Sequence, residues 1–318
     1  MRNILVTGAA GGLGACVCDR LAASGDTVFA ADVAAEALRS LKGRPGVVPL
    51  RLDVTSTRDV ARARKRIEAL TDGLDGLVGC AGIFRAGALV EVDEAAMAAA
   101  LDVNVMGAFR VVRAFFPLLA KRGGTVVLIG SESSRCAMPF NGPYTVSKCA
   151  LQAYADVLRR ELAFLGMRVA VIQPGAIRTP LLSGARSMAE AGKDRTRFPA
   201  QMDMVRRMLA REWEKGMEPA QVARVVVRAL RARRPRAVYR VGNDPRDLGT
   251  GGRREPVHGP RRPPGIRQPA SGRVRRILPR GRAAGTIPRP LTGAVRRPYR
   301  RDGSAPALRG ITAIGDGK

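Results

Sequence analysis

The sequence predicts an α/β fold in which a doubly wound parallel sheet carries helices on both faces. Three observations lead to this prediction. Short apolar segments alternate with longer segments of helical spacing between residues 3 and 241. The apolar segments are continuous, as in strands of a parallel sheet that is buried on both faces. The first of them runs directly into a glycine-rich turn, which commonly joins the first strand of such a sheet to its helix.

The elements follow one another as strand, then helix, along a single predicted domain, residues 1–244. The predicted strands are ILV (4–6), TVFAA (27–31), VVPLRL (47–52), GLVG (76–79), TVVLIG (125–130), RVAVIQ (168–173) and AVY (237–239). The predicted helices are Leu13–Ala23, Val60–Leu70, Ala95–Leu119, Tyr144–Leu165 and Ala220–Arg231. Crossovers between parallel strands are expected to be right-handed.

The composition changes after about Pro245. Residues 245–318 contain 11 of the 21 prolines, 13 of the 36 glycines, and 18 Lys+Arg against 4 Asp+Glu. We predict that this tail is disordered, because it cannot bury enough apolar surface to offset its ordering entropy. It is a solvated appendage, a basic arm for nucleic acid or anionic membrane, or an out-of-frame extension. Its abundance of arginine with a single lysine favours an out-of-frame extension. Resequencing around codons 243–250 would decide it.

Composition also excludes several kinds of chemistry. The net charge of +28 divides into +14 for the tail and +14 for residues 1–244, so the body is only moderately basic. The only histidine, His258, lies in the tail, which argues against a histidine triad or a histidine-based zinc site, and we expect no metal. The five cysteines are odd in number and lack metal-ligand spacing, which indicates reduced thiols in a cytoplasmic protein. No signal peptide or membrane span is expected.

The first predicted strand leads into TGAAGGLG, residues 7–14, and then into a helix. Glycines let the backbone approach a pyrophosphate, whose charge the amides and positive end of the helix attract. A glycine-rich turn alone is a weak signal, but this order of strand, turn and helix makes it more specific. The residues expected to hold a dinucleotide here are Thr7, Gly8, Gly12, Leu13 and Gly14.

Asp32 ends the second predicted strand, 18 residues after Gly14. A carboxylate at this point can accept hydrogen bonds from the adenosine ribose and would repel a phosphate on it. Gly11 leaves the loop without a basic residue. We therefore expect NAD as the cofactor rather than NADP. The alternative is that Asp32 is an exposed turn or cap residue.

With these motifs, the chain resembles the short-chain dehydrogenase/reductase family, in its compact single-domain branch, over residues 3 to about 243. The resemblance also rests on NVMG (104–107), a serine after the fifth strand, and YTVSK (144–148). It implies that Asp53 and Val54 contact the adenine. The residues that match the family's catalytic tetrad are Asn104, Ser131, Tyr144 and Lys148. Asn104, Tyr144 and Lys148 are expected to lie against the cofactor as well.

GCAG, residues 79–82, stands where this family usually has Asn-Asn-Ala-Gly. Ala81 and Gly82 keep the close backbone approach to the cofactor that the resemblance implies. Gly79 and Cys80 lack the asparagine side chain that normally steadies the fourth strand.

Tyr144 and Lys148 are four residues apart, so on a helix they face the same space. A tyrosine has a pKa of about 10, and a base that works near pH 8 needs a shift worth roughly 2.7 kcal/mol. A cation at about 4 Å supplies about 4 kcal/mol at an effective dielectric constant near 20. We therefore expect Lys148 and the oxidised nicotinamide to lower the pKa of Tyr144. Ser131 is expected to hold the substrate oxygen, and Asn104 to order a water that links Lys148 to solvent.

QPGAIRTP, residues 173–180, follows the sixth strand. The resemblance places the Pro174-Gly175 turn against the nicotinamide and Thr179 on its carboxamide. The alternative is an ordinary proline-glycine turn.

Residues 181–218 precede the last helix and are predicted to cover the active site as an apolar lid. A helix packed on the body is an equal alternative. PFNGPY, residues 139–144, is similar to the branch that acts on steroids and retinoids, so we expect a lipophilic alcohol or ketone as substrate. The lid's apolar residues are Leu181, Leu182, Met188, Phe198, Met202, Met204, Met208, Leu209 and Trp213.

The sequence thus predicts an NAD-dependent oxidoreductase acting on CH-OH groups. Helices 95–119 and 144–165 form the dimer face in relatives, and their alanines and leucines suit close packing, so we expect a homodimer. Two other classes stay open: a catalytically silent NAD-binding sensor, and a nucleic-acid-binding protein that acts through the tail.

Overall fold

The computed structural model describes residues 1–181 and 196–242, and all of them belong to one compact unit. The predicted tail and residues 182–195 of the predicted lid lie outside the described residues, with Leu182 and Met188 among them.

Seven parallel strands form one sheet in the order β3-β2-β1-β4-β5-β6-β7. Each adjacent pair is parallel, so the predicted fold class is confirmed. All seven predicted segments form strands, with ends shifted by up to two residues. Their bounds are β1 Asn3–Thr7, β2 Thr27–Asp32, β3 Val47–Arg51, β4 Gly76–Gly79, β5 Thr125–Ile129, β6 Arg168–Pro174 and β7 Val238–Val241.

Two of the helices, α3 and α4, begin after polar side chains that accept hydrogen bonds from amides of the first turn. Ser56 Oγ accepts a hydrogen bond from the Asp59 amide, and Asp93 Oδ1 accepts one from the Ala96 amide. The helices are α1 Gly12–Ala22, α2 Ala35–Arg39, α3 Thr57–Glu68, α4 Glu94–Leu101, α5 Ala108–Arg122, α6 Gly142–Ala163, α8 Pro199–Lys215 and α9 Pro219–Arg231. The short α2 was not predicted. A π-helical segment, η1 (Asp102–Gly107), joins α4 to α5, and a 3-10 turn, η2 (Glu132–Ser134), follows β5.

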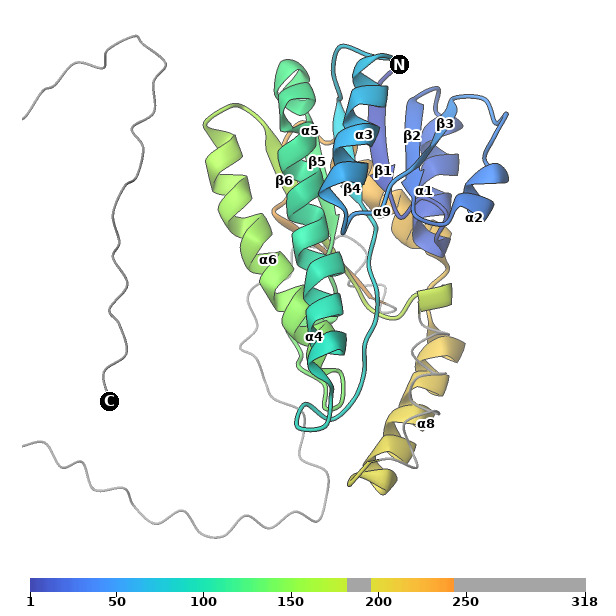
Figure 1. The fold of residues 1–318 in the computed structure, drawn as a ribbon, viewed down its shortest axis with the longest axis vertical. Helices are drawn as coiled ribbons and strands as arrows, with labels where there is room; N and C mark the ends of the chain where they lie inside the picture. The colour runs from blue at the N-terminus through green and yellow to red at the C-terminus, as the bar shows by residue number, and fades with distance from the viewer. Residues whose placement is uncertain (182–195, 243–318) are drawn as a thin grey trace, which may run out of the picture. The chain divides into compact units, whose positions relative to one another are not determined.

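Two apolar cores lie on opposite faces of the sheet (Figure 1). On one face α1 packs against α9, and the Arg231 guanidinium pairs with the buried Asp26 carboxylate at 2.6 Å. On the other face α3, α5 and α6 cover the sheet. Continuously apolar strands are therefore required, because both faces of the sheet are buried.

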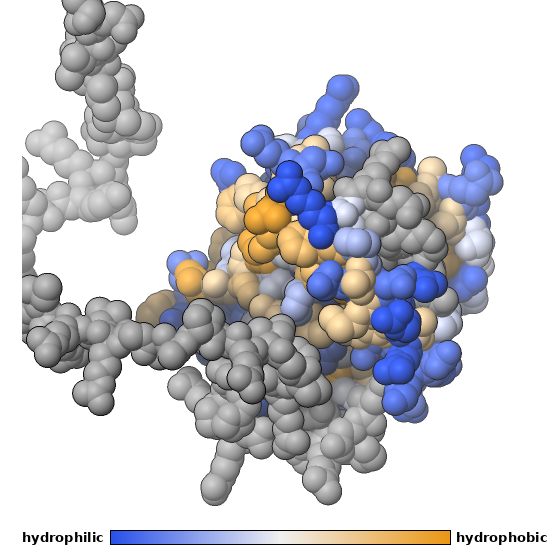
Figure 2. Space-filling view, turned by 90° about the horizontal axis from the view of Figure 1, so that it is seen from below, coloured by the Kyte–Doolittle hydropathy of each residue, from blue (hydrophilic) through white to orange (hydrophobic). Residues whose placement is uncertain are grey.

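The strand order places a crevice at the carboxyl ends of β1 and β4. The chain winds outward in one direction from β1 to β3 and in the other from β4 to β7, so the crossovers leave β1 and β4 on opposite faces. α4 and α8 lie at this end of the sheet (Figure 1). Apolar side chains gather in the middle of the same end, with hydrophilic side chains around them (Figure 2).

The elements α4, η1 and α5 form one helix, Glu94–Arg122, of 29 residues. By length and composition it could cross a membrane, which the sequence criterion of uninterrupted apolar residues did not detect. Core helices of soluble proteins meet the same criterion. Here the inner side packs on the sheet through Val111, Phe115 and Leu119, all buried.

Candidate active site

A cavity of about 810 Å³ opens at the carboxyl ends of the strands. It has a glycine end, lined by Gly8, Gly11, Gly12, Leu13, Gly14 and Asp32, and an aromatic end, lined by Phe84 and by Met208, Leu209 and Glu212 of α8. At the aromatic end Phe140 packs against the buried side chains of α8 and against Phe198. The cavity is lined by most of the predicted site residues: Gly8, Gly12, Leu13, Gly14, Asp32, Asp53, Val54, Ala81, Gly82, Ser131, Tyr144, Lys148, Pro174, Gly175 and Thr179. Thr7 and Asn104 are not in its lining.

At the glycine end the backbone segments are too close for side chains. Gly8 has φ +65°, and a Cβ there would lie 2.7 Å from the Ala81 nitrogen. A Cβ on Gly14 would lie 2.0 Å from the Gly8 carbonyl oxygen. The turn leads into α1, whose N-cap Gly11 has no side chain to occupy the first amides. Free amides at a helix N-terminus fit the pyrophosphate of a dinucleotide.

Asp32 is held by the loop that it faces. Its Oδ2 accepts a hydrogen bond from the Ala10 amide, and its Oδ1 accepts one from the Ala34 amide, both at 2.9 Å. Each oxygen keeps a lone pair for a ribose hydroxyl. Asp32 is therefore not a free surface residue but a fixed acceptor in the cavity wall. The described lining contains two basic residues, Arg85 in the segment after β4 and Lys148 on α6. Neither of them belongs to β2 or to the loop after it.

Asp53 follows β3 and also lines the cavity. Its Oδ1 accepts hydrogen bonds from the Thr55 hydroxyl at 2.7 Å and the Thr55 amide at 2.9 Å. These bonds lower the pKa of Asp53 below its ordinary value, so the carboxylate is charged at neutral pH.

Ser131, Tyr144 and Lys148 come together between β5 and α6. Ser131 follows β5, and its hydroxyl is a hydrogen-bond partner of the Tyr144 phenol. Lys148 is 5% exposed, and its Nζ lies 5.5 Å from the centroid of the Tyr144 ring. The same Nζ donates a hydrogen bond to the Ile129 carbonyl at 2.8 Å. One turn of α6 thus places phenol and ammonium on a common side, as their spacing predicted.

The predicted lowering of the Tyr144 pKa is wrong for the effect of the chain's own groups. Burial raises the pKa of Tyr144 to about 12, with a further increase from the Glu132 carboxylate, whereas the hydrogen bond with Ser131 lowers it. Burial also lowers the pKa of Lys148 to about 8. The loss of hydration therefore outweighs the attraction of a lysine whose ammonium is bonded to Ile129 rather than to the phenol.

Asn104 lies in the π-helical segment η1 and is 2% exposed. Its Oδ1 accepts a hydrogen bond from the Ile83 amide at 2.8 Å. Its Nδ2 donates to the Ile83 carbonyl at 3.0 Å and to Ser147 Oγ at 2.9 Å. The side chain therefore ties the segment after β4 to α6. A Cβ on Gly82 would lie 3.2 Å from Asn104 Oδ1 and 3.8 Å from Lys148 Nζ, so that glycine keeps the space between the two groups open.

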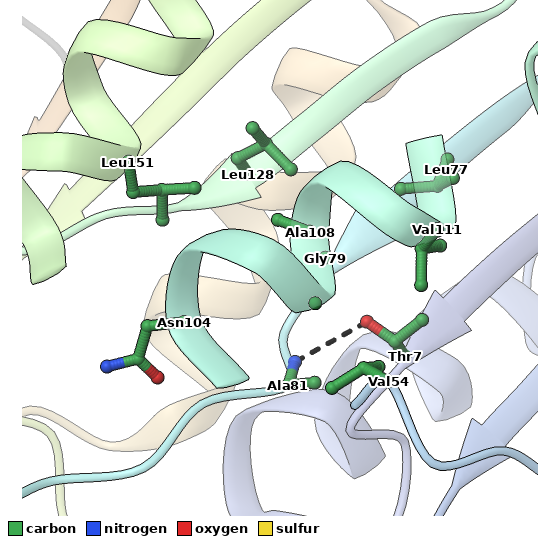
Figure 3. Close-up of a pocket in the computed structure, with 11 residues that line it drawn as sticks. Thr7, Val54, Leu77, Gly79, Ala81, Asn104, Ala108, Val111, Leu128 and Leu151 are labelled. Atoms are coloured by element: carbon green, nitrogen blue, oxygen red, sulfur yellow. Dashed lines mark hydrogen bonds between the residues drawn. The ribbon is translucent and has the colours of Figure 1, made fainter. Parts of the chain in front are cut away.

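Thr7 and Asn104 border a separate void of about 10 Å³ beside Gly79 (Figure 3). The void lies where an asparagine side chain at position 79 would be expected from the resemblance. The Thr7 hydroxyl accepts a long hydrogen bond, 3.5 Å, from the Ala81 amide. Thr7 thus supplies part of the connection that Gly79 cannot make. The next residue, Cys80, lines the main cavity, and burial raises the pKa of its thiol to about 12.

Thr179 and Gly175 complete the wall after β6. Thr179 is 9% exposed, and its Cγ2 would lie 2.9 Å from a Cβ on Gly12, so it packs on the glycine turn. A Cβ on Gly175 would lie 3.1 Å from a carboxylate oxygen of Glu132.

The aromatic end contains residues that the sequence analysis did not single out. The Phe84 and Tyr144 rings lie 4.8 Å apart. The buried side chains of α8 pack against Phe84 and Phe140. No three His, Cys, Asp or Glu side chains in residues 1–181 and 196–242 gather as a metal site requires. The unpredicted lining residues at this end are Phe84, Arg85, Glu132, Cys136, Met138, Asn141 and Glu212.

Comparison with known proteins agrees with this geometry. Residues 2–190 match the family model for short chain dehydrogenase. The chain is 30% identical over 265 residues to 3-amino-tetrahydro-pyrrolizinone reductase of Xenorhabdus hominickii, which covers 78% of this chain and 89% of the relative. It is 32% identical over 255 residues to human 17-beta-hydroxysteroid dehydrogenase type 1, with 74% and 76% covered. The crystal structure of a single-residue variant of actinorhodin polyketide ketoreductase with NADPH aligns with a TM-score of 0.65 at 25% identity, over 76% of this chain and 95% of the other.

Proposed function

Because the chain belongs to the short-chain dehydrogenase family, and is an oxidoreductase of that family acting on hydroxyl groups, we propose that it is NAD-dependent and interconverts a lipophilic alcohol and its ketone or aldehyde. The alcohol is primary or secondary. One observation carries the proposal: Ser131, Tyr144 and Lys148 line the cavity that the glycine turn also lines.

A nicotinamide cofactor held along the glycine end would supply or accept the hydride. Ser131 and Tyr144 hold the substrate oxygen through their hydroxyls. In reduction the Tyr144 phenol, which is protonated at neutral pH, donates a proton to that oxygen. In oxidation Tyr144 takes the proton back. Lys148 lies beside the phenol ring. When its amine is protonated, its positive charge stabilises the phenolate form of Tyr144.

NAD rather than NADP is supported by Asp32. Its carboxylate is held toward the cavity by two backbone amides, and the following residue, Val33, is apolar. A phosphate on the ribose would meet this negative charge, and neither basic residue of the described lining, Arg85 or Lys148, belongs to β2 or the loop after it. The ketoreductase structure that aligns with this chain contains NADPH, so both cofactors belong in every assay.

A lipophilic substrate is supported by the aromatic end and by two relatives. Leu181, Met208 and Leu209 line the cavity, and the α8 cluster closes it from one side. We propose that α8 acts as the part of the predicted lid that the structure describes. The relatives named as hydroxysteroid dehydrogenase and retinol dehydrogenase are consistent with a bulky apolar ligand.

Tyr144→Phe tests the activity. It removes only the hydroxyl that transfers the proton, so turnover of lipophilic alcohols should fall by at least about 100-fold. Tyr154→Phe is the matched control, because Tyr154 lies on the same helix and packs edge-on against Phe109, away from the cavity lining. Cofactor-coupled absorbance would measure turnover, and fluorescence titration would measure NAD binding in both variants. Equal loss in both variants, or full turnover in Tyr144→Phe, would contradict the assignment.

We also propose a homodimer through α5 and α6, which lie side by side (Figure 1). Apolar side chains are exposed along these helices and η1, with Val157 at 52%, Met106 at 43% and Phe109 at 36%. Val157→Arg would place a charge in such an interface. Light scattering at micromolar concentration should give a dimer for the wild type and a monomer for Val157→Arg, and a monomeric wild type would overturn the proposal.

The other expectations stay proposals. A cytoplasmic location is supported by five free cysteines. A silent NAD-binding sensor would bind NAD and oxidise no alcohol across a broad panel. A nucleic-acid-binding role would require that removal of residues 245–318 abolish that binding.

A further inference from the structure

Asn141 is a buried polar residue whose amide oxygen has no partner among the described residues. It is 7% exposed, it lines the cavity, and its Oδ1 neither accepts a hydrogen bond nor contacts solvent. A buried polar atom without a partner destabilises the folded protein, so it calls for an explanation. The residue precedes Tyr144 by three positions.

The obvious structural role of Asn141 is not used. It is the N-cap residue of α6, where asparagine commonly accepts a hydrogen bond from an amide of the first turn. Here the side chain caps no amide. Only the backbone carbonyl of Asn141 takes part in the helix start, because it accepts the first helical hydrogen bond, from the Thr145 amide at 2.8 Å. The side chain of Asn141 takes no part in it.

The backbone around Asn141 is strained and tightly held. Phe140 has φ +64°, which is unfavourable for a bulky side chain. Its carbonyl accepts a hydrogen bond from the Gly87 amide at 2.7 Å, and its ring packs on Phe198 at 5.7 Å. On the other side, a Cβ on Gly142 would lie 2.3 Å from Leu89 Cδ2. Neighbours on both sides thus fix the backbone that carries Asn141.

The surroundings of Asn141 at the aromatic end are largely apolar. Phe84, Met138 and Leu209 line the same part of the cavity. A neutral amide among apolar side chains adds little to general affinity for lipophilic ligands, but it discriminates strongly between ligands that pair with it and ligands that do not. Rotation of the amide about χ2 can present either Nδ2 or Oδ1.

We propose that Asn141 is a specificity-determining residue that hydrogen-bonds a second oxygen on the substrate, a hydroxyl near the carbon that reacts at Tyr144. The inference rests on the proposed function. It narrows the substrate class to lipophilic molecules that carry two oxygen functions on neighbouring parts of one skeleton, such as hydroxy ketones and their diols. The Asn141 amide then gains the partner that the protein does not supply.

The test compares 2-decalone with a set of monohydroxylated 2-decalones, which share its carbon skeleton. For the wild type, kcat/KM for one positional isomer should exceed that of 2-decalone by at least about tenfold. Asn141→Leu, which has similar volume and no polar end, should reduce this ratio to within about twofold. Tyr154→Phe changes a side chain of α6 outside the cavity lining and should keep the wild-type ratio.

A second measurement separates specificity from folding. Removing an unsatisfied buried amide should leave the urea midpoint of Asn141→Leu equal to or above that of the wild type. If Asn141→Leu does not fold, Asn141→Ala is measured in its place. Its ratio of kcat/KM values is also expected to fall to within about twofold.

The outcomes separate the two levels of the argument. Reduction of 2-decalone and its hydroxylated forms at equal efficiency, or a preference that survives in Asn141→Leu, overturns the role of Asn141 and leaves the proposed function standing. Absence of any Tyr144-dependent turnover across both ketones and lipophilic alcohols overturns the proposed function and this inference with it.

Discussion

At the glycine end of the cavity the groups are positioned by backbone, whereas at the aromatic end they are positioned by side chains that pack from distant segments. Gly8, Gly14 and Asp32 are fixed by close backbone contacts and backbone amides. Phe84 and Phe140 meet α8 through apolar contacts alone. The difference indicates one end that accepts a single ligand shape and another that adapts to its ligand.

The largest expected effect on stability comes from a substitution at the glycine end. Gly14→Ala would place a Cβ 2.0 Å from the Gly8 carbonyl oxygen, and two backbone segments must then move apart. We expect the free energy of unfolding to fall by about 3 kcal/mol and NAD binding to weaken with it. Urea unfolding and cofactor titration would measure both. Gly11→Ala, with a Cβ 3.3 Å from the same oxygen, should change the free energy by less than about 1 kcal/mol. Similar losses in the two variants would show that the contact is not decisive.

The next effect concerns Lys148, between the two ends. Its pKa is about 8 in the folded protein against 10.5 ordinarily, so between these pH values the unfolded chain binds more protons. The free energy of unfolding should therefore rise with pH, and the cost of burying the ammonium is fully present only below about pH 8. From pH 8 to about pH 9.5 the wild type should gain about 2 kcal/mol relative to Lys148→Met. Parallel stability curves for the two proteins would contradict the lowered pKa.

Asp32 gives a smaller effect at the glycine end. In Asp32→Ala the negative charge is lost, and the Ala10 and Ala34 amides lose their acceptor. We expect the ratio of kcat/KM for NAD to that for NADP to fall by about tenfold, which is roughly 1.4 kcal/mol. Asp53→Ala is the comparison, because Asp53 lies farther along the sheet edge and is expected at the adenine. A ratio that does not change in Asp32→Ala would remove the argument for NAD.

The smallest expected effect separates the aromatic end from the main core. Leu209→Ala acts in a small cluster on α8, so the global free energy of unfolding should fall by less than about 1 kcal/mol, while proteolysis within α8 becomes faster. Leu119→Ala, in the main core, should cost about 2–5 kcal/mol. Equal losses in the two variants would show that α8 unfolds together with the sheet.

Sequence reasoning was most successful where local patterns determine the structure. Glycine turns and the Tyr144–Lys148 spacing depend on short segments, so their placement around one cavity could be predicted. The π-helical segment at Asn104 could not be predicted, because a helix with or without it has the same apolar periodicity.

The aromatic end depends on contacts between segments far apart in the chain. The segment PFNGPY, which contains Asn141, was used to predict a lipophilic substrate. Its sequence does not indicate φ +64° at Phe140 or the absence of a side-chain cap at the start of α6. The prediction of the Tyr144 pKa was wrong for a similar reason. The spacing of Tyr144 and Lys148 suggested that the ammonium would lower this pKa, whereas the burial that raises it arises only in the folded protein.

The pairing of α1 with α9 has a consequence for biosynthesis. α1 ends at Ala22 and α9 begins at Pro219, so about 200 residues must be translated before the first helix meets its neighbour. At translation rates of about 5–20 residues per second, that interval is roughly 10–40 s. During that time α1 can pack only on the strands already synthesised, and the contact with α9 forms last.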